Sequence, residues 1–280
     1  MTALPTTPRT RTMPKSFPLQ LLLLASGVAL ALPAHAIDDD RFTVRIGAMN
    51  ADAQSTLRGR TDFAGDSIGF SEDFDFGGKE TVPRLEGQFR FSERNRLLFN
   101  YFNYNKDRRI TLEDELDYDG NLIPAGSFAK GEVDFEVASV VHDFAVTETD
   151  TFSWGLQVGA EYAKLEAKVY AEAGDETYRE RESSDGFAPV IGTRFTWAPA
   201  DAWRVVAQGQ YLNASWGSFG DYRGDLSRAN ALVEYRFTPN FGIHVGYDWF
   251  KLDVDKRGSD GMLGLKQEFK GPIAGITLAF

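Results

Sequence analysis

Hydrophobic and polar residues alternate with a period of two along most of the chain after residue 40, and this pattern predicts strands rather than helices. Most of the predicted strands carry apolar side chains on one face and charged or amide side chains on the other. Ten such segments occur, at 41–50, 81–91, 97–101, 131–144, 151–163, 187–197, 203–211, 228–237, 241–249 and 276–280.

The connections between these segments alternate between short and long. The stretches SERN, TETD, APAD and TPN are tight, whereas residues 57–79, 105–129 and 171–185 form long polar connections. Short turns on one side of a membrane and long loops on the other are typical of outer-membrane barrels. A soluble β-sandwich would also alternate, but it would not account for this asymmetry.

Aromatic residues gather beside the short turns, as in the girdle at one edge of a membrane. An even number of strands also returns the chain to the side where it began, and closure leaves no unpaired edge in lipid. The girdle candidates are Phe91, Phe144, Phe152, Trp154, Trp197, Trp203, Phe237, Phe241 and Phe280.

We therefore predict an all-β fold, a closed antiparallel up-and-down transmembrane β-barrel of ten strands. The second long connection reads as a hairpin that continues above the membrane. If it folded separately, eight or twelve strands would also be possible.

The first 36 residues read as a secretory signal peptide. Arg9, Arg11 and Lys15 precede a short apolar run from Leu19 to Leu32, and Ala34 and Ala36 supply the small residues of a cleavage site. The run is shorter than the roughly 20 residues of a membrane-spanning helix. We predict cleavage after Ala36, which leaves residues 37–280 as the barrel domain.

The leader, the alternating strands and the terminal phenylalanine together resemble the small outer-membrane β-barrel proteins of Gram-negative bacteria, the class of the OmpA-like and OmpW-like barrels. This resemblance implies a location in the outer membrane, in contact with its lipid and with lipopolysaccharide. It also implies that the last strand carries the signal read by the barrel-assembly machinery. Gly275, Leu278 and Phe280 match that signal, whereas Ile273 stands where the class usually has a polar residue.

Composition narrows the choice of function. The chain has 41 Asp and Glu against 30 Lys and Arg, and no cysteine. An acidic protein repels nucleic acid, so we expect no nucleic-acid partner. Thiol chemistry, disulfides and thiolate metal sites are excluded.

The polar faces of the strands predict a charged barrel interior. In the segment 131–144, Val133, Phe135, Val137 and Val141 would face lipid, and His142 would face inward. In a narrow barrel such charges should pair and fill the lumen, whereas open channels need roughly 16 strands. The predicted lumen network consists of Arg84, Glu86, Arg90, Glu132, Asp134, Glu136, Glu161, Arg194, Arg204, Arg228, Glu234, Arg236 and Asp248.

No catalytic or cofactor site emerges from the sequence. His142 and His244 both adjoin short turns, whereas barrel proteases and lipid A-modifying barrel enzymes, by resemblance of class, work at the outer rim. Asp143 lies on the opposite face of its strand from His142 and cannot orient that ring. The interpretation is a non-catalytic envelope structural or surface-interaction protein without cofactor, with a narrow ion or small-solute channel and an outer-membrane hydrolase as the alternatives.

The long connections are rich in acids and could bind divalent cations that bridge to lipopolysaccharide phosphates, since hard oxygen ligands suit calcium and magnesium. No firm metal site follows from their spacing. The oligomeric state is left open. The candidate cation ligands are Asp73, Asp75, Glu115, Asp117 and Asp119.

Overall fold

The structure is a computed structural model of the chain. It describes residues 40–63, 66–75, 79–111, 116–118, 121–123, 128–173, 176–218, 222–258 and 261–280. The predicted signal peptide lies outside the described residues.

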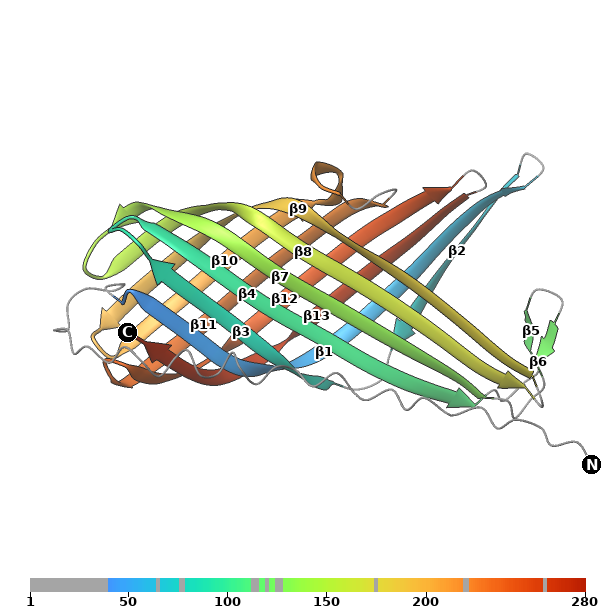
Figure 1. The fold of residues 1–280 in the computed structure, drawn as a ribbon, viewed down its shortest axis with the longest axis horizontal. Coiled ribbons are helices and arrows are strands. Elements are labelled where there is room, and N and C mark those ends of the chain that lie inside the picture. The colour runs from blue at the N-terminus through green and yellow to red at the C-terminus, as the bar shows by residue number, and fades with distance from the viewer. Residues whose placement is uncertain are drawn as a thin grey trace, which may run out of the picture. The chain divides into compact units, whose positions relative to one another are not determined.

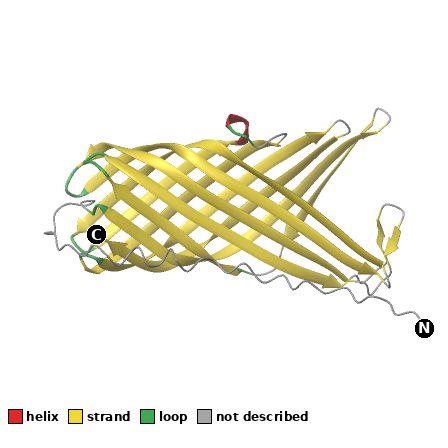
Figure 2. Ribbon diagram, in the orientation of Figure 1, coloured by secondary structure: helices red, strands yellow, loops and turns green. Residues whose placement is uncertain are grey.

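Nearly all of the described chain is β-strand (Figure 2). A single turn of 3-10 helix, η2 (Ala214–Trp216), interrupts the strands. No helix among the described residues is long and apolar enough to cross a membrane. The strands are β1 (Phe42–Phe63), β2 (Asp66–Asp75), β3 (Glu80–Arg90), β4 (Asn95–Thr111), β5 (Leu116–Tyr118), β6 (Asn121–Ile123), β7 (Phe128–Glu148), β8 (Phe152–Ala173), β9 (Glu176–Ala200), β10 (Trp203–Asn213), β11 (Tyr222–Thr238), β12 (Phe241–Gly258) and β13 (Gly261–Ala279).

The strands form a closed antiparallel barrel in sequence order (Figure 1). Strands β2 and β3 pair with successive parts of β1, so together they occupy one position in the wall. The wall therefore has ten strands, as predicted, and the pairing of β13 with β1 closes it. Strands β5 and β6 form a separate hairpin at the second long connection.

The barrel carries an apolar belt on its outer surface, which identifies the membrane-spanning zone. Val158 and Val245 are each 56% exposed although they lie in mid-strand. On β12 the belt runs from Phe241 to Trp249, close to the roughly 9–11 residues that a tilted strand needs to span a bilayer. A continuous apolar surface of this kind is unfavourable in water, whereas lipid covers it.

Aromatic pairs border both edges of the belt. At the short-turn end Trp203 packs on Tyr235 with ring centroids 4.8 Å apart. At the opposite edge Tyr162 packs on Phe187 at 5.0 Å. The first of these girdles was predicted from the aromatic residues beside the short turns. The second was not, because its residues lie far from any turn.

Polarity inverts beyond the second girdle. Within the belt the side chains are apolar outside and polar inside, but farther from the short turns the pattern reverses. On β12, for example, the outer face carries Tyr247 and Trp249, whereas Phe250 and Leu252 continue on the inner face. The extended end of the barrel is therefore built like a water-soluble barrel, with polar residues outside and an apolar core.

The long connections are mostly strand. Strand β8 runs to Ala173 and β9 begins at Glu176, so the predicted loop at 171–185 is a continuation of the β8–β9 hairpin. Strands β1 and β2 likewise extend through much of 57–79. These parts of the strands contain few apolar residues, so hydrophobic periodicity did not predict them.

The extended end divides into two wings (Figure 1). Pairing of β3 with β4 ends at Arg84, next to Pro83, and pairing of β9 with β10 ends at Val190, next to Pro189. At these two places neighbouring strands separate and leave a seam between the wings. Proline has no N–H to donate to a ladder, so each seam begins where the ladder would lose a hydrogen bond. The first wing is built from β4, β7, β8 and β9, and the second from β11, β12, β13, β1 and β2.

Candidate functional site

The interior at belt level holds three clusters of ion pairs and hydrogen bonds. The first centres on two carboxylates between two arginines. Arg84 donates from Nε to Asp248 Oδ2 at 2.7 Å and from Nη2 to Glu86 Oε1 at 3.0 Å. Arg228 donates from Nη2 to the same Glu86 oxygen at 3.1 Å. The two arginines thus join β3 to β11 and β12.

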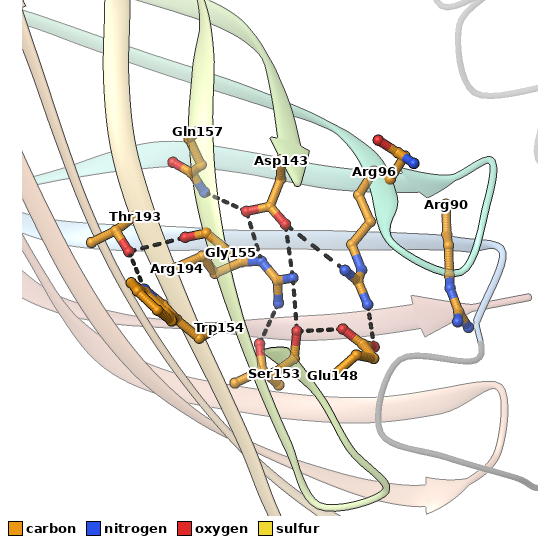
Figure 3. Close-up of polar contacts among 12 residues, drawn as sticks. Arg90, Arg96, Asp143, Glu148, Ser153, Trp154, Gly155, Gln157, Thr193 and Arg194 are labelled. Atoms are coloured by element: carbon orange, nitrogen blue, oxygen red, sulfur yellow. Dashed lines mark hydrogen bonds and ion pairs between the residues drawn. The ribbon is translucent and has the colours of Figure 1, made fainter. Parts of the chain in front are cut away.

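The second cluster surrounds Asp143, which is fully buried (Figure 3). Arg194 grips this carboxylate with Nη2 on Oδ1 at 3.0 Å and Nε on Oδ2 at 3.3 Å. Gln157 donates to Oδ2 at 3.2 Å. Arg96 lies 3.9 Å from Oδ1 and also binds Glu148. A forked guanidinium on a buried carboxylate is a strong, directional contact.

The third cluster lies near the short-turn end around Glu234. Arg236 Nε donates to Oε1 at 2.7 Å, and Arg45 Nε donates to Oε2 at 2.9 Å. Thr277 donates to Oε2 at 3.2 Å and contacts His244 at 3.1 Å. His244 therefore faces the interior and belongs to a structural network.

Beyond the ion pairs, toward the extended end of the barrel, the lumen is filled by aromatic rings. Phe102 stacks on Phe250 at 4.9 Å, and Phe135 stacks on Phe269 at 5.1 Å. All four rings are at most 1% exposed. The Arg228 guanidinium sits 4.8 Å from the Phe250 ring centroid, so a cation–π contact joins the two layers.

A polar cavity of about 30 Å³ remains among the ion pairs. Its lining includes Arg194, Arg228 and Asn230. Arg228 Nη1 and Asn230 Oδ1 are buried without a protein partner. A water needs roughly 10–15 Å³ of such space, so the cavity suits about two waters.

Glu161 also points inward, but it joins none of these clusters. It is 1% exposed, and neither carboxyl oxygen has a hydrogen-bond partner. Its neighbours across the ladders are Ser139 and Ala188. The remaining predicted lumen residue, Arg204, is buried and lies 4.0 Å from Asp40.

Four members of the predicted lumen network lie elsewhere. Glu132, Asp134 and Glu136 are on the outer surface of β7, not in the lumen, because the inward residues of this segment are Phe135 and Val137. The inverted polarity of the extended end is the physical reason. The fourth, Arg90, donates to the carbonyls of the first short turn.

The same correction applies to the rest of that segment. Val141 faces the interior, and His142 faces lipid, where it contacts Asn95 at 2.9 Å and the Phe91 ring at 5.9 Å. Asp143 is consequently an interior residue. The alternation of Val133, Phe135, Val137 and Val141 predicts the opposite orientation of this strand, which would turn Asp143 outward.

On the outer surface of the extended end, one carboxylate gathers three cations. Glu166 accepts from Arg181 at 2.9 Å and lies 3.1 Å from Lys164 and 2.9 Å from Lys168. Lys168 also donates to Glu132 at 2.7 Å. Hydrogen bonding, first from Lys168, lowers the pKa of Glu166 to about 2.

The other predicted residues fall in three places. Phe91, Trp154, Trp197, Trp203, Phe237 and Phe241 lie along the outer surface at the short-turn end. Gly275 and Leu278 lie in β13, paired on both sides, and Phe280 ends the chain beside Phe42. Among the candidate cation ligands, Asp73 and Asp75 belong to β2 and Asp117 to β5, while Glu115 and Asp119 lie outside the described residues.

No protein-family model matches the sequence, and no curated protein matches it. Solved structures match its fold. The outer-membrane protease OmpT from Escherichia coli has a TM-score of 0.56 at 10% identity, over 89% of this chain and 99% of that one. The translocator domain of the autotransporter NalP from Neisseria meningitidis has a TM-score of 0.44 at 12% identity, over 85% and 87%.

The toluene transporter TodX from P. putida has a TM-score of 0.36 at 8% identity, over 87% of this chain and 91% of that one. Of these three structures, OmpT has a TM-score above 0.5, and at 10% identity its likeness shows the fold alone. The chain thus has the fold of an outer-membrane β-barrel. Its activity has to be argued from its own residues.

Proposed function

We propose that this chain is a non-catalytic protein of the outer membrane, with a closed lumen and a structural or surface-interaction role. The observation that carries the proposal is the double filling of the lumen. Three ion-paired clusters occupy it at belt level, and the rings of Phe102, Phe135, Phe250 and Phe269 lie above them. Since outer-membrane barrels have short turns on the periplasmic side, the two wings would stand outside the cell.

Single-channel conductance of the refolded barrel in a planar bilayer tests this proposal. We expect a silent barrel that shifts on gels when heated. Replacing Phe102 and Phe250 together by Ala should open the aromatic layer and produce discrete, salt-dependent steps. The matched control is Phe195→Ala, which removes a lipid-facing ring. Steps from the unmodified barrel would overturn the proposal.

A narrow channel is the second candidate, favoured by the polar cavity beside Arg194 and Arg228. A conducting unmodified barrel would support it. In that case Arg194→Gln, with the same fold by gel shift, should change ion selectivity.

A hydrolase is less well supported. Of the two histidines after residue 36, His142 lies on the lipid face and His244 is bound to Thr277 near the short turns, so neither lies at the wing end. An assay for peptide and ester hydrolysis by the refolded barrel tests this alternative directly.

The partners implied by the sequence enter the proposal as well. Lipopolysaccharide would contact Lys164, Lys168 and Arg181, which stand on the outer surface just beyond the Tyr162–Phe187 pair. Divalent cations at the acidic connections would bridge to its phosphates, which limited proteolysis with and without a chelator can test. The barrel-assembly machinery would read Gly275, Leu278 and Phe280 during insertion.

A further inference from the structure

The seam between the two wings at β9 leaves a strand edge open. Strand β9 has 25 residues and β10 only 11. Their ladder ends at the Val190–Leu212 pair, but β9 continues to Glu176 with β8 on its other side. Within the described ranges, no strand pairs with this part of β9 on the seam side.

Contacts at Phe187 fix the direction of the free backbone groups. Ser218 N donates to Phe187 O at 2.8 Å, and Phe187 N donates to Ser218 Oγ at 3.4 Å. The amide and carbonyl of Phe187 thus point away from β8 and into the seam. Because bonding direction alternates along an antiparallel strand, those of Asp185 and Ser183 point the same way. Pro189 shares this direction, which explains why the β10 ladder stops there.

An apolar pocket of about 50 Å³ opens beside this edge, on the inner side of the wall. Ser184 of β9 forms one wall, and Ala214 of η2 and Leu226 of β11 face it across the seam. At roughly 10–15 Å³ per water-sized probe, the pocket suits the end of one aliphatic side chain. Its remaining apolar lining is Phe135, Ala163, Leu165, Leu212, Leu252 and Val254.

We propose that this seam binds an extended polypeptide segment of a surface partner by strand addition to β9. The added segment would continue the line of β10 beyond Ser218, which already holds the backbone groups of Phe187. Its backbone would bond to Ser183 and Asp185, and one inward side chain would enter the apolar pocket. Main-chain bonds supply affinity in this mode of recognition, and side-chain pockets supply specificity.

The surroundings define the chemistry of the partner. Inside the wing the wall is apolar and outside it is polar, so the partner segment should alternate apolar and polar residues. Arg179 and Arg181 lie exposed on the outer face of the edge, Arg181 donating also to Glu166, and the exposed Asp185 stands on the same face. Outward residues of the partner should therefore be acidic where they lie opposite the arginines. Charged residues along an edge also oppose pairing between identical barrels, which leaves the site to a complementary segment.

A peptide library displayed on phage, panned against the refolded barrel, provides the probe. The decisive variant is Asp185→Pro, which removes a seam-facing N–H without touching the β8 ladder, and the matched control is Asp185→Ala, which keeps that N–H. We expect the barrel and the Ala variant to enrich peptides with alternating apolar and acidic residues. Binding to the Pro variant should be about fivefold to tenfold weaker, since a net hydrogen bond is worth about 1 kcal/mol.

Changes in the peptide avoid any doubt about folding of the variant. An enriched peptide with N-methyl groups on the amides that face β9 should lose binding, whereas methylation of the opposite amides should be tolerated. Leu226→Asp should weaken peptides with an apolar central residue. Failure to enrich any peptide over the Asp185→Pro barrel, or binding that ignores both N-methyl patterns, overturns the proposal.

This inference rests on the proposed surface-interaction role, but the two can fail separately. Conductance of the unmodified barrel would remove the closed lumen and leave the β9 edge untouched. A silent barrel that enriches no peptide would retain the closed lumen and remove the strand-addition site.

Discussion

Phe42 and Phe280 exchange two backbone hydrogen bonds, with N–O distances of 3.0 and 2.8 Å. These bonds join the first residue of β1 to the last residue of the chain and complete the circle of strands. Phe280 thus supplies both the backbone closure and an aromatic ring at the short-turn edge of the belt.

Deleting Phe280 should lower the free energy of unfolding by about 1–3 kcal/mol, because it leaves the amide and carbonyl of Phe42 without partners. Urea unfolding in vesicles, followed by tryptophan fluorescence, measures the change. Phe280→Leu is the control, since it keeps both backbone bonds and loses only the ring. Equal losses in the two variants would show that the ring, not the closure, stabilises this end.

Removal of the buried carboxylate of Asp143 should lower the free energy of unfolding by more than deletion of Phe280. In Asp143→Ala the Arg194 guanidinium stays buried without its anion, which costs about 3–5 kcal/mol. Replacing both residues by Leu should recover part of this loss, because no charge is then left unpaired. The exposed Asp107–Lys130 pair is the control, and Asp107→Ala should have a much smaller effect in the same unfolding assay.

Glu166 predicts a stability change in acid. Its pKa in the folded protein is about 2, below the 4.5 of the free side chain, so its ion pairs stabilise the fold fully above pH 4.5. This contribution should fade as the pH falls from 4.5 to 2. The urea midpoint of Glu166→Gln should therefore lie below that of the unmodified barrel at pH 7 and approach it near pH 2. A gap that does not change with pH would contradict the pKa assignment.

The barrel itself was predictable because the belt imposes one rule on ten strands. Apolar side chains must face lipid there, so the phase of alternation shows the inner and outer faces of β3, β9, β11 and β12 directly. The alternation of short and long connections then gives the topology. That rule depends only on whether a side chain is apolar or polar, not on its contacts.

The extended end was not predictable in the same way, because the rule reverses in water. Strand β7 crosses the boundary, with Phe135 and Val137 inside and Val140 and Phe144 outside. Its apolar residues therefore lie on both faces of the strand, and those from Val133 to Val137 indicate the wrong lipid-facing side. Pairing with β4 places Phe102 opposite Val137 and so determines which face of β7 is inside the barrel. The sequence of β7 alone does not predict that pairing.

Single cysteines can test the corrected phase of β7, since the chain contains no cysteine of its own. In folded barrels in vesicles, Glu132→Cys should react with a bulky water-soluble maleimide, because residue 132 lies outside on the first wing. Val140→Cys should react only with a lipid-soluble reagent. Val137→Cys should be protected from both until the barrel is unfolded, because its neighbours are the lumen rings.

The opposite phase predicts a different labelling pattern. Val137 would then be open to the lipid-soluble reagent, and Glu132 would be shielded in the lumen. Labelling of Val137→Cys in the folded barrel would therefore place Glu132, Asp134 and Glu136 back inside. It would also separate Asp143 from Arg194 and remove the central cluster of the closed lumen.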